Sequence, residues 1–372
     1  MIATLRAWCY RLALRLASHC GSSTKQSQYH YRLAILKLDR LGDAVLSLGA
    51  VKHLVGGLAE EDTLLIVSPI AEPLFRAEFP ETAMLVLPSF CERFWPDFLI
   101  FLWRHTAQLR ALSVESLVCL RHQPSDYLHA IARLISPQRC HASTWDKPWG
   151  SVCLTFPAVK QTPYPLTGGE VCFELEAHRR VVGAAVGREV KLAEVMPAIS
   201  FVTPSFGDSL VVCPQAGSSI REYPPALLAE ALQLFLKHRS MPVHFCVAPG
   251  TDAGPWQQAL GEAGLVGVTW HIPATFMDLL MLLANARLVL AMESAPAHLA
   301  AAMDKAGVFL LGGGHFGMFA PWKRSDRQIW LRHEMECYQC WWHCIHPEPY
   351  CITQIEPDAV AAAMLEAVGG PR

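Results

Sequence analysis

The stretch from Arg287 to Met303, which reads RLVLAMESAPAHLAAAM, constrains the fold of this chain more than any other. Residues Arg287 to Ala291 are too apolar to alternate and too few for a core helix, which predicts a short strand buried on both faces. Ser294 and Pro296 stand where a helix would begin, as a capping hydroxyl and a residue whose fixed φ suits the first turn. The stretch therefore predicts a strand, a tight loop and a helix, the repeating unit of a doubly wound parallel sheet.

The start of that helix is also a candidate binding site. The first backbone N–H groups of a helix have no partner within it, so a loop of this kind can bind an anion. Glu293 and His298 flank the loop with a carboxylate and an imidazole. Because many such loops bind nothing, and because His298 equally fits a buried structural histidine, this stretch alone leaves the function open.

Composition narrows the class of protein. The chain has 372 residues, which is enough for two domains. Hydrophobic residues make up 52% of it and charged residues 17%, a composition that predicts large cores rather than disorder. A net charge of −2 gives no electrostatic case for nucleic acid as a partner. No window reaches the ~18 uninterrupted apolar residues of a membrane-spanning helix. We therefore expect a cytoplasmic protein.

Residues 1–28 predict an amphipathic segment followed by a linker. Leu5, Trp8 and Leu12 share one helical face, and Arg11 and Arg15 lie beside it. Such a helix can touch an anionic inner-membrane surface, or it can pack on its own domain. The arginines interrupt any apolar run, so a secretory signal is not expected.

The first half of the chain, residues 29–191, predicts a parallel α/β domain. An apolar strand at Leu33 to Leu38 leads into DRLGD and then a helix from Ala44 to Leu54. Gly42 permits a tight turn. Asp43 is either only a helix cap or a carboxylate at the end of the strand, where open α/β sheets bind their ligands. Further strands are expected at 64–67, 84–87 and 116–120, helices at 94–112, 126–135 and 170–186, and a long loop at 145–167.

The second half begins after a linker at 192–209 and spans 210–356, with a terminal helix at 357–372. A strand at Leu210 to Cys213 runs into PQAGSSIREYPP. Its small residues would let backbone amides approach a phosphate, and Arg221 adds a forked cation suited to phosphate oxygens. The small residues are Ala216, Gly217, Ser218 and Ser219. Further helices are expected at 226–237, 252–263 and 277–284, and strands at 243–247 and 308–311. Two similar α/β halves facing each other across a cleft are the expected architecture.

Three motifs resemble one known family in order and in placement. LKLDRLGDAVLS, PQAGSSIREYPP and RLVLAMESAPAHLAAAM resemble signatures of glycosyltransferase family nine, the lipopolysaccharide heptosyltransferases. The resemblance implies the GT-B fold, with two Rossmann-like domains facing across a cleft. It also implies inverting transfer of heptose from ADP-heptose to a lipopolysaccharide core, without a metal in the chemistry. The chain has no GxGxxG after its first strand and no P-loop motif, which disfavours ordinary dinucleotide and P-loop enzymes.

The resemblance also implies site roles. Asp43 would be the general base, with Gly42 beside it. Arg221 and the backbone N–H groups of Ser294 and Ala295 would stabilise the leaving diphosphate. The loop of Ala216, Gly217, Ser218 and Ser219 would contact the donor, Glu293 would bind sugar hydroxyls, and His298 would contact the donor or pack.

The motifs depart from the family pattern at four positions. Glu293 replaces Asp, Ala295 and Gln215 replace Gly, and Arg221 replaces Lys. These departures leave the donor's identity open. Those at Gln215, Glu293 and Ala295 also keep open a catalytically silent GT-B protein that binds a nucleotide sugar. Within the enzyme class, a polypeptide hydroxyl as the acceptor is a further alternative, which would make the chain a protein O-heptosyltransferase.

Four late cysteines form a candidate structural metal site. They are Cys337, Cys340, Cys344 and Cys351, spaced CxxC, three residues, Cys, six residues, Cys. Four thiolates suit tetrahedral zinc or a single iron, and some protein-glycosylating heptosyltransferases have a four-cysteine metal finger. The ligand spacing is tighter than in a usual two-knuckle zinc site, and His343 or His346 can replace a thiolate. Disulfides or free thiols are the alternatives to a metal site. No cofactor is expected for catalysis.

Overall fold

The computed structural model describes residues 29–89, 95–121, 125–145, 159–161, 172–205 and 207–369. The chain divides into two compact units, Met1–Pro163 with Glu174–Met196, and Tyr164–Phe173 with Pro197–Arg372. The amphipathic segment predicted over residues 1–28 lies outside the described residues, as does most of the predicted loop at 145–167. No helix in the described ranges has the length and apolar character needed to cross a membrane.

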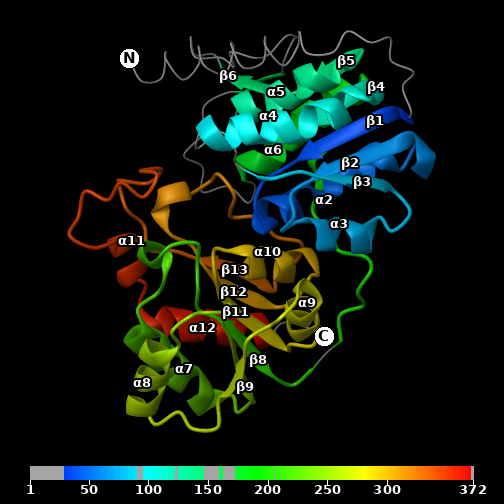
Figure 1. Cartoon of the computed structure of the whole chain (residues 1–372). Coiled ribbons are helices and arrows are strands. Elements are labelled where there is room, and N and C mark those ends of the chain that lie inside the picture. Colours follow the sequence, from blue (N-terminus) through cyan, green and yellow to red (C-terminus); the bar gives the residue numbers. More distant parts are fainter. Residues whose placement is uncertain are drawn as a thin grey trace. The chain divides into compact units, whose positions relative to one another are not determined.

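The first unit is built on a parallel sheet of order β3-β2-β1-β4-β5. Alternate residues of its central strands point to opposite faces, and both faces are apolar and need a covering layer. Helices α4 and α5 cover one face, and α2 lies against β1 on the other (Figure 1). The strands are β1 (Tyr29–Lys37), β2 (Thr63–Val67), β3 (Ala83–Val86), β4 (Leu112–Cys119) and β5 (Arg139–His141), with the short pair β6 (Ser143–Trp145) and β7 (Val159–Gln161). The helices are α2 (Leu41–Val55), α3 (Glu72–Glu78), α4 (Trp95–Arg110), α5 (Asp126–Ile135) and α6 (Phe173–Val186).

Helix α2 begins at Leu41, three residues earlier than predicted. Arg40 occupies the N-cap position with an extended backbone, and its carbonyl accepts a hydrogen bond from Ala44 N at 2.9 Å. Gly42 is therefore inside the helix and not in the turn. Asp43 was wrongly expected to cap the helix and instead lies in its first turn, where the N-terminal end of the helix dipole favours a carboxylate.

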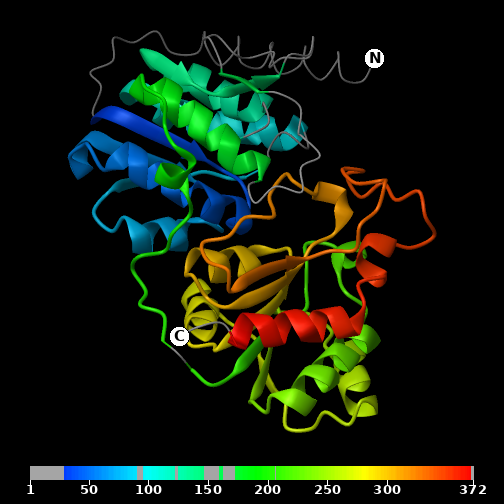
Figure 2. The same cartoon turned by 180° about the vertical axis from the view of Figure 1, so that it is seen from behind.

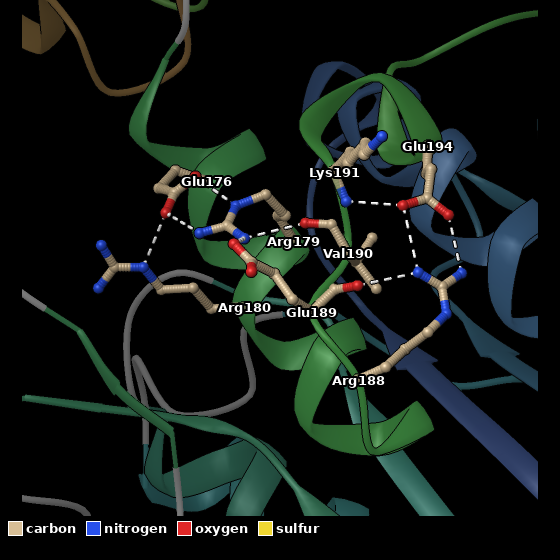
Figure 3. Close-up of polar contacts among 8 residues, drawn as sticks. All are labelled: Glu176, Arg179, Arg180, Arg188, Glu189, Val190, Lys191 and Glu194. Atoms are coloured by element: carbon tan, nitrogen blue, oxygen red, sulfur yellow. Dashed lines mark hydrogen bonds and ion pairs between the residues drawn. The ribbon is translucent and has the colours of Figure 1, made fainter.

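The end of the first unit is anchored by two arginines. Arg179 on α6 donates to Glu176 Oε1 at 2.7 Å and to the Val190 carbonyl at 2.9 Å (Figure 3). Arg188 donates to Glu194 Oε2 at 2.7 Å, as Figure 3 also shows. These contacts tie the chain after α6 back to the helix and fold it into the short 3₁₀ helix η3 (Leu192–Val195).

Helix η3 packs directly on α2 at a glycine. A Cβ placed on Gly49 would lie 2.2 Å from the carbonyl oxygen of Val195, closer than any side chain can approach. Gly49 is therefore required by close backbone approach, which the sequence alone does not reveal.

The second unit is built on a parallel sheet of order β10-β9-β8-β11-β12-β13. Helices α7, α8 and α12 pack together on one face and α9 with α10 on the other, and Figure 2 shows α12 in red beside the green α7. The strands are β8 (Leu210–Cys213), β9 (Val243–Cys246), β10 (Thr269–His271), β11 (Leu288–Met292), β12 (Gly307–Leu310) and β13 (Gln328–Leu331). The helices are α7 (Pro225–His238), α8 (Gly254–Glu262), α9 (Phe276–Ala284), α10 (Ala295–Ala302), α11 (Tyr350–Thr353) and α12 (Pro357–Gly369).

Most predicted elements of this unit are confirmed within a residue or two, but β10 and β13 are additional. Both lie at the ends of the sheet, where one edge has no strand beside it. Their three and four residues are mostly half-buried, so they lack the continuous apolar run that identified the central strands.

Candidate active site

The strand orders place two of the three motifs together. In the second unit the order reverses between β8 and β11, and ligands of open α/β sheets bind at the carboxyl ends of strands at such a reversal. The loop after β8 carries Arg221, and the loop after β11 carries Glu293. Two segments 72 residues apart in sequence therefore meet at the expected ligand position.

Arg221 and Glu293 form a close, buried ion pair. Arg221 Nη2 lies 2.6 Å from Glu293 Oε2 and donates to the Glu293 backbone carbonyl at 2.7 Å. The exposed fractions of the two side chains are 16% and 5%. Burial raises the pKa of Glu293, and the attraction of Arg221 opposes that rise. The pair places a cation and a carboxylate side by side at the strand ends. Sugar binding by Glu293 stays a prediction.

Arg221 has a third contact and one unused donor. Its Cζ lies 5.4 Å from the centre of the Trp342 ring, a cation–π distance. Its Nε is buried and has no hydrogen-bond partner among the described residues. A diphosphate oxygen is the kind of acceptor that would satisfy this N–H.

The small-residue loop before Arg221 is open to solvent only in part. Gly217, Ser218 and Ser219 are exposed, and Ser218 caps the short helix η4 (Ser219–Arg221) with its backbone. The amide of Ala216 donates to Glu222 Oε1 at 3.2 Å, so this amide is already engaged. The exposed part of the loop therefore fits phosphate contact better than its first residue does.

Gln215 shows why a glycine is not needed at its position. Its Oε1 accepts from Ala248 N at 2.6 Å, and its Nε2 donates to Thr251 Oγ1 at 2.9 Å. The side chain thus ties the loop after β8 to the loop after β9. This departure from the family pattern has a structural explanation within the unit.

The start of α10 differs from the prediction in one contact. Ser294 is at the N-cap position, as expected, and Pro296 lies in the first turn. The Ser294 hydroxyl, however, donates to the Met292 carbonyl at 3.1 Å and does not cap the helix. The side chain therefore leaves the first N–H groups of α10, including that of Ala295, without a cap from Ser294, which suits an anion at this terminus.

His298 is buried behind this loop. Its Nδ1 accepts a hydrogen bond from Trp322 Nε1 at 3.1 Å, and the planes of the two rings differ by only 2°. Only 3% of the residue is exposed. Burial, together with the charge of Arg221, lowers the pKa of His298 to about 3. The imidazole is thus neutral at physiological pH and packs in the core. Its contact with a donor stays a prediction.

The first unit has a buried charge cluster that sequence reasoning missed. The side chain of Lys37, the last residue of β1, is 1% exposed. Its Nζ lies 3.1 Å from Asp39 Oδ2 and 3.0 Å from Glu174 Oε1. Arg121, after β4, lies 3.4 Å from Asp39 Oδ1. Because β1 and β4 flank the reversal of strand order in this unit, the cluster marks the equivalent ligand position. A lysine ending an apolar strand was the available sequence signal.

Asp43 belongs electrostatically to this cluster. Burial by itself lowers the pKa of Lys37, but the carboxylates of Asp39, Glu174 and Asp43 outweigh it and raise that pKa. Lys37 is therefore cationic, and Asp43, in the first turn of α2, lies close enough to contribute to its pKa. The role of Asp43 as a general base stays a prediction.

The late cysteines lie around the loop after β12. Cys351 is 8% exposed, and the thiols of Cys337, Cys340 and Cys344 are near enough to raise its pKa, a smaller effect than burial itself. Yet within the described ranges no group of three or more His, Cys, Asp or Glu side chains converges as a metal-binding set. As they stand, the four thiols do not form a ligand cage. The metal site stays a prediction.

Comparison with known proteins agrees with the fold. The fold is that of GT-B glycosyltransferases, and the expected enzyme class, a glycosyltransferase, is confirmed. Residues 204–344 match the model of glycosyltransferase family 9 (heptosyltransferase), so the family resemblance is confirmed over this part of the chain. No curated protein sequence matches the chain.

Several solved structures are similar to the whole chain. Escherichia coli heptosyltransferase WaaC with ADP-2-deoxy-2-fluoro heptose has a TM-score of 0.61 at 14% identity, over 89% of this chain and 98% of its own. E. coli heptosyltransferase II has a TM-score of 0.61 at 14% identity, over 91% and 98%. The iron-containing dodecameric glycosyltransferase TibC from enterotoxigenic E. coli has a TM-score of 0.53 at 13% identity, over 91% and 76%.

Proposed function

We propose that this chain is an inverting heptosyltransferase that moves a heptose, or a related sugar, from a nucleotide donor such as ADP-heptose to a lipopolysaccharide core. The observation that carries the proposal is the junction of Arg221 and Glu293 at the strand reversal of the second unit. The cation suits a diphosphate, and the carboxylate beside it suits sugar hydroxyls. Structures similar in fold contain ADP or ADP-heptose derivatives.

The chemistry requires one base and one stabilised leaving group. Asp43 takes the proton of the acceptor hydroxyl while the acceptor oxygen attacks the anomeric carbon of the donor sugar. The bond from that carbon to the phosphate oxygen breaks, and the electron pair leaves with the nucleoside diphosphate. Arg221 and the N–H groups at the start of α10 stabilise the negative charge that develops there. No metal takes part in this step.

Arg221 is the residue through which the donor assignment is tested. In Arg221→Ala we expect donor affinity to fall by about tenfold to a hundredfold, because a hydrogen bond to a charged group is worth about 1.5–3 kcal/mol. Turnover should fall as well, because the diphosphate is charged before and during transfer. Isothermal titration with ADP measures the affinity, and an unchanged dissociation constant would remove Arg221 from the site.

Acceptor choice separates the proposal from its alternatives. Purified protein is incubated with ADP-heptose and a heptose-deficient lipopolysaccharide core, and products are identified by mass. Transfer to the core supports the proposal. Transfer only to a polypeptide hydroxyl indicates the protein O-heptosyltransferase. The cysteine-rich segment, residues 337–351, and the likeness to an iron-containing heptosyltransferase favour this alternative. ADP-heptose binding without turnover on either acceptor indicates a silent binding protein.

We further propose that the enzyme acts in the cytoplasm and touches the inner membrane peripherally through residues 1–28. The paired apolar and basic faces of this segment support such contact. Co-flotation with anionic but not neutral vesicles, lost on deletion of residues 1–28, is the expected result.

A further inference from the structure

Trp342 is the aromatic residue beside the arginine of the donor site. The Arg221 guanidinium carbon lies 5.4 Å from the centre of the Trp342 ring, and Arg221 Nη2 also pairs with Glu293. The indole Nε1 is buried and, in the described part of the chain, has no hydrogen-bond partner. The ring therefore acts on Arg221 through its π face rather than through its N–H.

Glycines after β12 make room for this ring. A Cβ on Gly312 would lie 2.3 Å from Trp342 Cη2, and a Cβ on Gly314 would lie 2.4 Å from Trp342 Cδ2. Only glycine at these two positions lets the indole lie flat against the backbone at the carboxyl end of the sheet. The position of one tryptophan thus explains two of the three consecutive glycines at 312–314.

The segment that carries Trp342 is fixed in an unfavourable backbone conformation. Gln339, Trp341 and Trp342 have φ values of 65°, 54° and 63°, a region that non-glycine residues rarely adopt. Two backbone hydrogen bonds offset the strain: Gln339 N donates to Gly313 O at 2.8 Å and Trp341 N to Gly314 O at 3.0 Å. Strain of this kind persists only where surrounding contacts fix it, and it clusters at ligand sites.

We propose that Trp342 is a positioning residue for Arg221, so that the cysteine-rich segment completes the diphosphate-binding site of the second unit. The indole face restricts the guanidinium to the plane in which Nη2 meets Glu293 and Nε points to the diphosphate. A free arginine side chain would lose more rotamer entropy when the donor binds. This inference rests on the proposed donor site and adds to it a residue outside the three family motifs.

A double-mutant cycle with ADP as the probe tests the inference. In Trp342→Leu we expect ADP affinity to fall by about fivefold to thirtyfold, as loss of a partly desolvated cation–π contact predicts. Trp342→Phe keeps a π face and should recover most of the affinity. In the Arg221→Ala background, Trp342→Leu should change the affinity by less than about twofold, because the partner is already gone. A merely structural role for Trp342 would give additive losses instead.

Two controls keep the test decisive. Trp341→Leu removes the neighbouring indole, which has the same backbone conformation and lies 5.4 Å from His315, and should leave ADP affinity unchanged. If Trp342→Leu does not fold, Gly314→Ala displaces the same ring without deleting it, and its effect should likewise vanish in Arg221→Ala.

The outcomes distinguish the inference from the function on which it rests. If the wild-type protein does not bind ADP, or if Arg221→Ala binds it equally well, the donor site itself is wrong and the role of Trp342 is overturned with it. Three results would overturn only the positioning role, provided that Arg221→Ala lowers ADP affinity. Trp342→Leu could leave the affinity unchanged, its loss could add to that of Arg221→Ala, or Trp342→Phe could lose as much affinity as Trp342→Leu.

Discussion

Individual side chains explain two departures from the family pattern. Glu293 is one methylene longer than the usual aspartate, and its Oε2 lies 2.6 Å from Arg221 Nη2. Gln215 replaces a glycine, and its amide links two neighbouring loops through Ala248 and Thr251. Both substitutions keep the loops at the strand ends in place.

His298 gives a prediction for stability against pH. Its pKa is lowered from 6.5 to about 3, first by burial and then by Arg221. Between those values the unfolded chain binds a proton on this ring and the folded chain does not. The free energy of unfolding should therefore rise with pH across this window, by up to about 1.4 kcal/mol per pH unit, and level off above it.

The variant His298→Asn keeps an acceptor for Trp322 Nε1 but cannot titrate. Urea unfolding of both proteins between pH 4.5 and 7.5 should show a smaller slope in the variant, while the titrations of all other groups cancel in the difference. Equal slopes would show that His298 binds a proton in the folded protein as readily as in the unfolded chain.

Among elements, the contact of η3 with α2 depends on Gly49. Gly49→Ala places a methyl group 2.2 Å from Val195 O, so the helix and the 3₁₀ turn must separate. We expect a loss of about 1–3 kcal/mol in the free energy of unfolding, as overpacking produces. Gly57→Ala is the matched control, because its added Cβ meets nothing within 4 Å. Equal stability of the two variants would show that this contact yields without cost.

The cysteine-rich segment gives a second prediction for an element. If Cys337, Cys340, Cys344 and Cys351 bind a structural ion, they must move together, since the described residues present no converged set. Elemental analysis of protein purified without a histidine tag should then find about one equivalent of zinc or iron. Cys340→Ser should lose it, whereas Cys213→Ala, in the sheet core, should keep it. Less than about a tenth of an equivalent, with four reactive thiols, would exclude the site.

For the whole molecule, donor binding and turnover should depend on different units. Asp43 lies in the first unit and Arg221 in the second. Asp43→Asn is therefore expected to keep ADP affinity while turnover on the true acceptor falls by about 10²–10⁴-fold, the usual contribution of a general base. Calorimetry with ADP and a transfer assay on the same preparation check both. Wild-type turnover in the variant would remove Asp43 from catalysis.

Local sequence patterns located the central strands, most of the helices and the loops that carry Arg221 and Glu293, but not the edge strands β10 and β13. Buried strands and proline-led helices are local patterns, so they can be recognised without the fold. Which side chains meet depends on the tertiary structure. The pairing of Arg221 with Glu293 follows from the adjacency of β8 and β11, and the buried ion pair of Lys37 joins β1 to Glu174 of α6.

The same reason explains what was missed. Gly49 and Gly314 carry no local signal of their close contacts, because the nearest atoms that an added Cβ would meet lie 28 or more residues away in the chain. Ser294 read as a cap because serine usually caps, yet its hydroxyl found the carbonyl of Met292. Such contacts depend on which backbone groups folding brings within hydrogen-bond distance, and local sequence does not encode that distance.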